Sequence, residues 1–410
     1  MTRVPYPIEL VRQQFPALRR THNGKPVAYF DGPGGSQVVA TCIEAMADYM
    51  RKGGGNLHGP FPSSLETEAH ILEAKQAMAD LLNVEPSEIA FGANATTLLF
   101  HVARALGRGW KPGDEIVVTE LDHRGNVDPW ITLAKDQGVT VRWLKVDTES
   151  FTLDLSELDS IINEKTKLVA VGLASNAVGT ISDVAKVSAR ARQVGALVAV
   201  DAVQAVAHVS VDFQALGADI LTCSAYKFFG PHIGIIAIRS KLFEQLDVYK
   251  LVPAPAHAPD KLETGTLNHE GIAGIRPAVE FIAALGAGAT RRERIISGYE
   301  RLEDHENRLV DKLRASLAVM PRVKLYQASA DIRKTPTVAL TVKGMAPAEV
   351  CKRVVDASSV FIADGNFYAW TLAEKLGINP TGAWVRAGLS PYNSEEEVDR
   401  FIAAMRRVVQ

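Results

Sequence analysis

Short apolar runs alternate with helical patterns through the middle of this chain, and this alternation restricts the possible folds more than any other feature. The runs lie at residues 115–119, 139–144, 168–173, 197–200, 220–223 and 233–238. Helical patterns include residues 67–82 and 184–194, the latter with Asp183 as an N-cap and Gly195 just past its end. Continuous apolar strands joined by helices are typical of a sheet buried on both faces. The sequence therefore predicts an α/β protein with a mostly parallel sheet.

Two charged residues stand at the ends of such runs. Asp201 follows the run at 197–200, and Lys227 closes the segment 220–227, which breaks into a turn containing Gly230 and Pro231. Ligands of α/β sheets bind at the ends of strands, where a lysine held partly out of water can become a neutral nucleophile. A Schiff-base lysine and an aspartate facing a pyridinium nitrogen are the pair that pyridoxal phosphate (PLP) chemistry requires.

Taken singly, each residue has an ordinary structural explanation, because such a lysine is usually solvated and such an aspartate is usually a cap. Five segments in family order favour the functional interpretation: residues 92–97, 122–126, 175–180, 201–204 and 224–227. On these segments, the chain resembles the class V aminotransferases of PLP fold type I, and within them the cysteine desulfurase and selenocysteine lyase group. The resemblance runs from about Tyr29 to the C-terminus.

The resemblance implies a large PLP-binding domain and a smaller α+β C-terminal domain. The large domain would hold a mostly parallel seven-stranded sheet flanked by helices. A change of pattern after about Leu285, followed by a long charged helix from Arg291, agrees with that division. We expect the large domain at 25–285, and a small domain formed by 1–24 together with 286–410.

The resemblance also places the cofactor phosphate on Ala95, Thr96 and Thr97. These residues open an apolar helical run, so free backbone N–H groups and the helix dipole can bind an anion there. Plain N-capping by Thr96 is the structural alternative. Ser224 and Tyr226 are expected to add hydroxyl donors, although desulfurases usually carry histidine where Tyr226 stands.

Further roles follow from the same resemblance. His123 is expected to stack on the cofactor ring and to move protons on the substrate side. Asn176 and Gln204 would donate hydrogen bonds to the cofactor's phenolic oxygen, with a simple turn as the alternative for Asn176. Arg386 would bind a substrate α-carboxylate, unless it forms a structural ion pair. His58 and Asn176 are also assigned to the substrate.

One residue points to a second subunit. Thr266 matches a family segment that reaches the phosphate of the neighbouring subunit. The resemblance therefore implies a homodimer with shared active sites.

The loop after residue 362 departs from the desulfurases, which carry there a cysteine that accepts sulfur as a persulfide. About that position, this chain has Tyr368, and its cysteines are Cys42, Cys223 and Cys351. The leading hypothesis is a C–S (β-) lyase or desulfurase-like enzyme acting on cysteine or a cysteine-derived amino acid, with Lys227 as the base and no persulfide relay. A class V aminotransferase or epimerase is the alternative, and a non-catalytic PLP-fold binding protein is the second.

The composition bears on the partners, metal sites and location that can be expected. The chain has 410 residues, 47% of them hydrophobic, and a formal net charge of −2, so it gives no electrostatic reason to expect nucleic acid or an anionic membrane as a partner. The cysteines show no pairing or metal-site spacing, which favours a reducing cytoplasm and predicts no metal site. No apolar stretch is long enough for a signal peptide or a membrane span.

Overall fold

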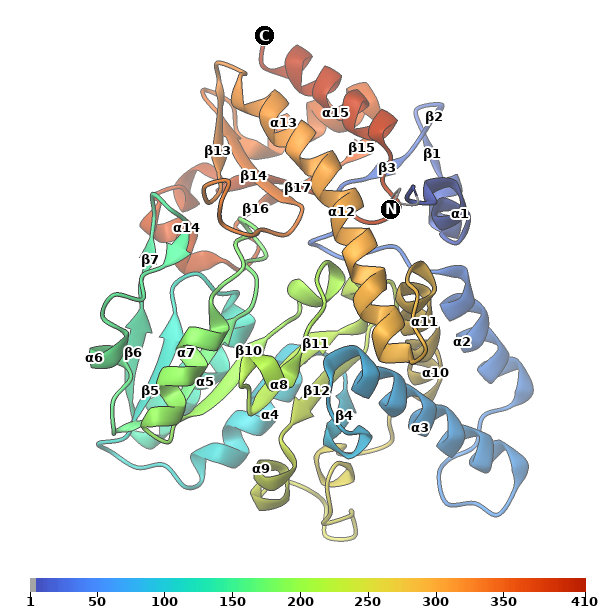
Figure 1. The fold of residues 1–410 in the computed structure, drawn as a ribbon, viewed down its shortest axis with the longest axis vertical. Helices are drawn as coiled ribbons and strands as arrows, with labels where there is room; N and C mark the ends of the chain where they lie inside the picture. Colours follow the sequence, from blue (N-terminus) through green and yellow to red (C-terminus); the bar gives the residue numbers. More distant parts are fainter. Residues whose placement is uncertain (1–4) are drawn as a thin grey trace.

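The computed structural model describes residues 5–410 and contains a central seven-stranded sheet with helices on both faces (Figure 1). β12 runs antiparallel to both of its neighbours, and all other neighbouring strands run parallel. In spatial order the strands are β4 (Ile89–Gly92), β12 (Gly234–Ile238), β11 (Ile220–Ser224), β10 (Leu197–Asp201), β9 (Thr166–Gly172), β5 (Glu115–Thr119) and β6 (Thr140–Leu144). The predicted mostly parallel sheet is confirmed.

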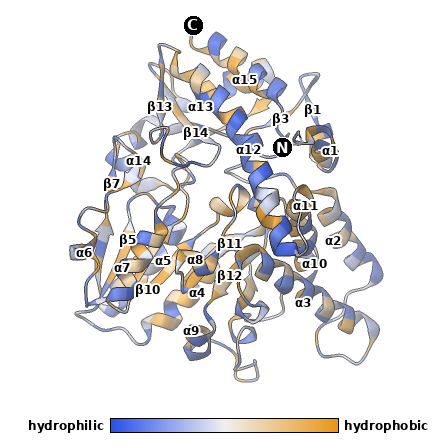
Figure 2. Cartoon of the chain, viewed as in Figure 1, coloured by the Kyte–Doolittle hydropathy of each residue, from blue (hydrophilic) through white to orange (hydrophobic). Residues whose placement is uncertain are grey.

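Side chains of the central strands alternate between two apolar clusters. In β9, Leu168 and Ala170 pack towards one cluster, and Val169 and Val171 pack towards the other. The first face is covered by α4 (Ala95–Gly107) and α5 (Asp128–Gln137), and the second by α3 (Pro62–Leu82), α7 (Val184–Gln193) and α11 (Ile275–Leu285). Burial on both faces explains why these strands are mostly apolar, and Figure 2 shows the apolar residues gathered there.

Further helices complete this part of the chain. They are α2 (Ala40–Lys52), α6 (Leu158–Ile161), α8 (Phe213–Leu216), α9 (Ser240–Gln245) and α10 (His269–Ala273). The N-cap predicted for α7 is confirmed, because the Asp183 side chain accepts a hydrogen bond from the Lys186 backbone N–H.

A long helix, α12 (Arg291–Ala318), connects the two cores. Its first half places Ile295 and Leu302 in the large cluster, and its second half places Leu309 and Leu317 in a separate cluster. That second core lies against an antiparallel sheet with the order β13 (Val323–Tyr326), β14 (Thr337–Val342), β17 (Trp384–Gly388) and β16 (Ala363–Gly365). It is completed by α13 (Pro347–Ser358) and α15 (Glu395–Val408), while α14 (Trp370–Lys375) lies beside the cavity described below.

The N-terminal segment packs differently from the predicted division at residue 25. β3 (Ala28–Tyr29) pairs with β15 (Val360–Phe361), which buries Ala28 and Phe30 in the small-domain core. In contrast, Val11 and Phe15, in and just after α1 (Ile8–Gln13), pack into the large cluster. The chain therefore enters the small-domain core between residues 18 and 28 and is back in the large-domain core by residue 39, because strand pairing with β15 holds residues 28–30 in the small domain.

Across residues 5–410, no helix combines the length and the apolar character needed to cross a membrane.

Candidate active site

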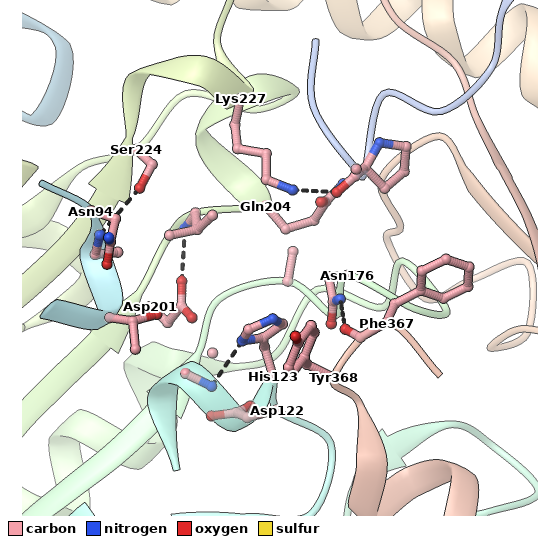
Figure 3. A pocket seen from close by; sticks show the side chains of 18 of the residues that line it. Asn94, Asp122, His123, Asn176, Asp201, Gln204, Ser224, Lys227, Phe367 and Tyr368 are labelled. Carbon is pink, nitrogen blue, oxygen red and sulfur yellow. Dashed lines mark hydrogen bonds between the residues drawn. The ribbon is translucent and has the colours of Figure 1, made fainter. Parts of the chain in front are cut away.

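A cavity of about 340 Å³ lies at the carboxyl ends of β5, β9, β10 and β11, and the N-terminus of α4 forms one wall. Its other walls come from the loop containing Pro33 and Gly34, the turn containing Phe367 and Tyr368, and Arg386 on β17. Figure 3 shows Lys227, Asp201 and His123 projecting into this space from different sides. The cavity therefore lies where the ends of parallel strands meet the small domain, as ligand sites in open α/β sheets do.

Lys227 follows β11 directly and is 7% exposed. Its ammonium nitrogen donates a hydrogen bond to the Pro33 carbonyl oxygen. Burial, with a smaller contribution from the nearby Arg386 charge, lowers the pKa of Lys227 to about 7. A lysine with this pKa is partly neutral near physiological pH, and it can then act as a nucleophile or a base.

Asp201 ends β10, and its Oδ1 accepts a hydrogen bond from the Val203 backbone N–H at 2.8 Å. Loss of contact with water raises the pKa of Asp201 to about 6, while that hydrogen bond and the Lys227 charge act in the opposite direction. A carboxyl group of this kind gains from a cationic partner, and a protonated ring nitrogen would supply one.

The first turn of α4 faces the cavity through Ala95 and Thr96. The Ala95 N–H points to the Ser224 hydroxyl oxygen at 3.4 Å, and Asn94 caps the helix by accepting the Thr97 N–H at 2.8 Å. The cap is therefore Asn94, and the structural alternative of capping by Thr96 is wrong. The Thr97 hydroxyl also donates to Asn94, at 3.0 Å, and its side chain lines a different hollow, so the structure places Thr97 outside this cavity.

His123 lies near the first turn of α4, because a Cβ added to Gly125 would be 2.8 Å from His123 Nδ1 and 2.9 Å from Thr96 Oγ1. Its Nδ1 accepts the Gly125 backbone N–H at 2.8 Å, and burial, followed by the Lys227 and Arg386 charges, lowers its pKa to about 4. The imidazole is therefore neutral at physiological pH, with its proton on Nε2. Its ring centroid lies 5.3 Å from that of Tyr368.

Asn176 and Gln204 line the cavity, but each uses an amide N–H within the protein. Asn176 donates to the Phe367 carbonyl at 2.7 Å, and Gln204 donates to the Thr337 hydroxyl at 3.4 Å. Their side-chain oxygens are buried and have no hydrogen-bond partner within residues 5–410. Each amide nitrogen carries a second N–H, so the expected donation to a phenolic oxygen stays a prediction.

Arg386 is 3% exposed in the middle of β17. One terminal nitrogen donates to the Asn176 carbonyl at 3.0 Å, and the other lies 3.3 Å from an Asp31 carboxylate oxygen. The Phe367 ring lies flat against it, with 3.6 Å between the guanidinium carbon and the ring centroid. Burial lowers the pKa of Arg386 to about 10, so it remains a cation at physiological pH. Its Nε has no partner within the described residues and is free to bind a carboxylate.

The chain matches known proteins over most of its length. A family model described as aminotransferase class-V covers residues 28–401. A cysteine desulfurase from Dickeya dadantii (strain 3937) is 30% identical over 419 residues, which cover 98% of this chain and 97% of that protein. The aminotransferase-like protein FGM3 of Gibberella zeae is 31% identical, with 100% of both chains covered. The chain belongs to the class V aminotransferase family.

Solved structures agree with this membership. The apo structure of a cysteine desulfurase from Thermococcus onnurineus NA1 has a TM-score of 0.87 at 31% identity, and 100% of this chain and 99% of that chain are covered. A cysteine desulfurase from Escherichia coli has a TM-score of 0.85 at 24% identity, a likeness of fold. The expected fold type I is thus confirmed. Class V aminotransferases are PLP-dependent, and this protein is a PLP-dependent enzyme.

The cavity of this class V aminotransferase fits PLP on three independent grounds. Lys227 supplies a buried amine of lowered pKa, and Asp201 supplies a carboxylate at the end of a neighbouring strand. The first turn of α4 supplies a helix N-terminus for a phosphate, and Gly234 lies so close that an added Cβ would be 2.4 Å from the Asn94 backbone. Ser224 and Tyr226 line the same space, and Tyr226 stacks on His232 with 4.8 Å between ring centroids.

Besides Thr97, two predicted residues lie away from this chain's own cavity. His58 has a side chain that is 84% exposed, in the loop before α3. Thr266 lines a separate hollow together with Thr97 and His101. Their expected roles, including contact with a neighbouring subunit, stay predictions.

Sequence reasoning missed two carboxylates at the site. Asp31 pairs with Arg386, and Asp122 lines the cavity beside His123. Burial raises the pKa of Asp122 to about 7, with the Asp201 charge adding to the rise, and Asn126 donates to it at 2.8 Å. Asp122 lies inside a segment that resembles the family, so it could have been singled out. Asp31 precedes a Gly-Pro-Gly-Gly turn, and this turn is the one sequence signal that could have drawn attention to it.

The cysteines lie away from the reacting space. Cys42, Cys223 and Cys351 are free and buried, and none lines the cavity. Burial raises the pKa of Cys42 and of Cys351 to about 12, and it also raises that of Cys223. Such thiols remain protonated and unreactive. Within residues 5–410, no three His, Cys, Asp or Glu side chains are grouped so as to hold a metal ion.

Proposed function

We propose that the protein is a C–S (β-) lyase or desulfurase-like enzyme that acts on cysteine or a cysteine-derived amino acid. The observation that carries the proposal is the composition of the cavity. It combines Lys227, Asp201, His123 and Arg386 with an aromatic turn at Tyr368, where desulfurases carry a sulfur-accepting cysteine. Relatives named cysteine desulfurase support the choice of a sulfur-containing substrate.

Arg386 would hold the substrate α-carboxylate through its free Nε and the terminal nitrogen that now faces Asp31. Both nitrogens lie on one edge of the guanidinium, so a carboxylate can bind them together. Phe367, stacked on the guanidinium face, limits the carboxylate to approach in the plane of the fork. This orients the substrate so that its amine and Cα lie towards Lys227.

PLP, when bound, accepts the electron pair left behind when the Cα proton departs. Lys227 would carry out that proton transfer, since its Nζ has a pKa of about 7 and can take up and return a proton near neutral pH. Asp201 would stabilise a positive charge on the ring nitrogen. His123 is neutral and can donate a hydrogen bond from Nε2 to a group leaving from Cβ.

None of the three cysteines can accept sulfur in the cavity, and this determines how the sulfur would leave. The three cysteines are buried and lie outside the cavity, so sulfur would leave as a small molecule. The test is to incubate the purified PLP-loaded protein with a panel of amino acids. Release of sulfide or a thiol together with pyruvate and ammonia is expected. A keto acid formed together with pyridoxamine phosphate would instead establish transamination.

We also propose that the protein acts as a homodimer with shared active sites. Exposed apolar side chains on α2, α3 and the loop before α3 support a subunit interface there: Ile43, Met50, Phe61, Leu65 and Leu72. Thr266 and His58, which lie outside this chain's own cavity, would then serve the neighbouring one. The cytoplasmic location stays a prediction.

A further inference from the structure

A second hollow, of about 680 Å³, lies against the outer side of Tyr368. We call it the outer groove, and its walls are Arg124, Asp128, Trp143, Asn366, Tyr368, Trp370, Thr371 and Glu374. Tyr368 lines both the outer groove and the cavity, so the two spaces adjoin at this side chain. The large and small domains both contribute to the groove, as they do to the cavity. Ligand sites are common at such boundaries.

Hydrogen bonds hold the backbone of Tyr368, whereas its side chain is largely exposed. Its carbonyl accepts the Arg124 backbone N–H at 2.8 Å, and the preceding Phe367 carbonyl accepts Asn176 Nδ2 at 2.7 Å. Both aromatic residues have a left-handed backbone, with φ of 51° and 60°, which these two hydrogen bonds help to hold. The Tyr368 side chain is 69% exposed, and its hydroxyl has no hydrogen-bond partner within residues 5–410.

The groove presents flat aromatic surfaces. Trp370 is 49% exposed at the start of α14, and Trp143 lies on the edge strand β6. Arg124 is already paired with Asp128 and with the Thr371 hydroxyl, so it is not a free cation for an anionic ligand. Indole and phenol rings bind other planar rings by offset or edge-to-face packing.

We propose that the outer groove is a subsite for the distal part of the substrate, which would be an amino acid carrying a flat aromatic substituent beyond Cβ. This inference rests on the proposed function, since it needs an amino acid whose carboxylate is held by Arg386. With the carboxylate there and the reacting Cα near Lys227, the side chain points to the His123 and Tyr368 side of the cavity. Tyr368 then stands between the substituent and the indoles of the groove.

The experiment compares S-benzyl-L-cysteine with S-methyl-L-cysteine on the PLP-loaded protein. Equilibrium dissociation constants are measured from the change in cofactor absorbance, and KM and kcat are measured separately. Trp370→Ala and Trp143→Ala each remove one indole, and Tyr249→Ala, which removes a 56% exposed aromatic side chain away from both spaces, is the matched control.

The parent protein should bind the benzyl compound more tightly than the methyl compound. Each tryptophan variant should weaken benzyl binding by roughly three- to tenfold and leave methyl binding within about twofold. Tyr249→Ala should match the parent. Equal binding of both compounds by the parent would overturn the inference, and so would tryptophan variants that affect both compounds equally or neither. If the parent bound no amino acid at all, the proposed function itself would fail.

Discussion

Lys227 owes its reactivity to its surroundings, because burial lowers the pKa of an ordinary lysine amine to about 7 in this cavity. The amine is protonated below that pH and neutral above it. Attachment of PLP to the apo-protein should therefore speed up as the pH rises through about 7 and then level off. Stopped-flow absorbance after mixing with PLP measures this rate.

Lys227→Ala should abolish that attachment while leaving the fold intact. The variant should lose the visible absorbance band, and borohydride treatment should add no cofactor mass to the protein. A borohydride-reducible imine found on the Lys227→Ala protein would show that another lysine carries the cofactor.

Arg386 is expected to bind the substrate and to have little effect on cofactor retention. Arg386→Ala should raise KM for an amino acid by a factor equivalent to about 2–5 kcal/mol of binding free energy, the cost of a broken buried charge pair. The PLP content should hardly change. Asp31→Asn is the control, since it keeps the guanidinium and removes only a 42% exposed partner, so KM should change less than about tenfold. Loss of PLP with an unaltered KM would assign Arg386 to structure.

The buried cysteines give a fourth prediction at this scale. Turnover should survive replacement of Cys42, Cys223 and Cys351 by Ala or Ser, apart from losses of stability, because their thiols are protonated and outside the cavity. Activity and mass spectrometry of single and triple variants check this. A folded single variant that loses activity, together with a persulfide on that cysteine in the parent, would contradict it.

At the scale of elements, the approach of β12 to the start of α4 shapes the expected phosphate site. A Cβ on Gly234 would lie 2.4 Å from the Asn94 carbonyl carbon, and backbone there cannot yield without shifting the first turn of α4. Gly234→Ala should therefore weaken PLP binding by roughly 5- to 150-fold, the equivalent of roughly 1–3 kcal/mol of strain. Absorbance titration with PLP measures the change.

Two controls separate a local effect from a general one. Gly109→Ala follows the end of the same helix, with its nearest atom at 3.8 Å, and should match the parent. Pyridoxal, which lacks the phosphate, should bind Gly234→Ala nearly as well as it binds the parent. Equal weakening of PLP and pyridoxal would place the phosphate elsewhere.

Elements were predicted well where their signals are local. The strands at β5, β9, β10 and β11 and the helix α12 follow from apolar runs and capping residues within a few positions. The direction of β12 could not be predicted, because an apolar run reads the same in either direction. Its pairing with β4 depends on residues that are far away in the sequence. The position of β3 beside β15 was missed for the same reason, since two-residue strands carry no periodicity.

For the whole molecule, shared active sites predict complementation between subunits. Lys227→Ala removes the amine, and Thr266→Glu would place a negative charge beside the neighbouring phosphate, so each homodimer should be impaired. After the two variants are unfolded and refolded together, mixed dimers should contain one intact site, and about a quarter of the parent activity should return. Activity and analytical ultracentrifugation are the measurements. A monomer at assay concentration, or a mixture without recovery, would contradict shared sites.

By itself, the sequence determined the α/β class, the order of the chemical residues along it and the absence of a reactive cysteine near Tyr368. These properties depend on local periodicity and on residue identity at strand ends, and both can be read directly from the sequence. Tertiary structure alone decided that Asp31 meets Arg386 across a separation of 355 residues, that Asn176 holds the Phe367 carbonyl and that Thr97 turns away from the cavity. Such contacts depend on how the two cores dock, and docking depends on packing between segments that no local pattern connects.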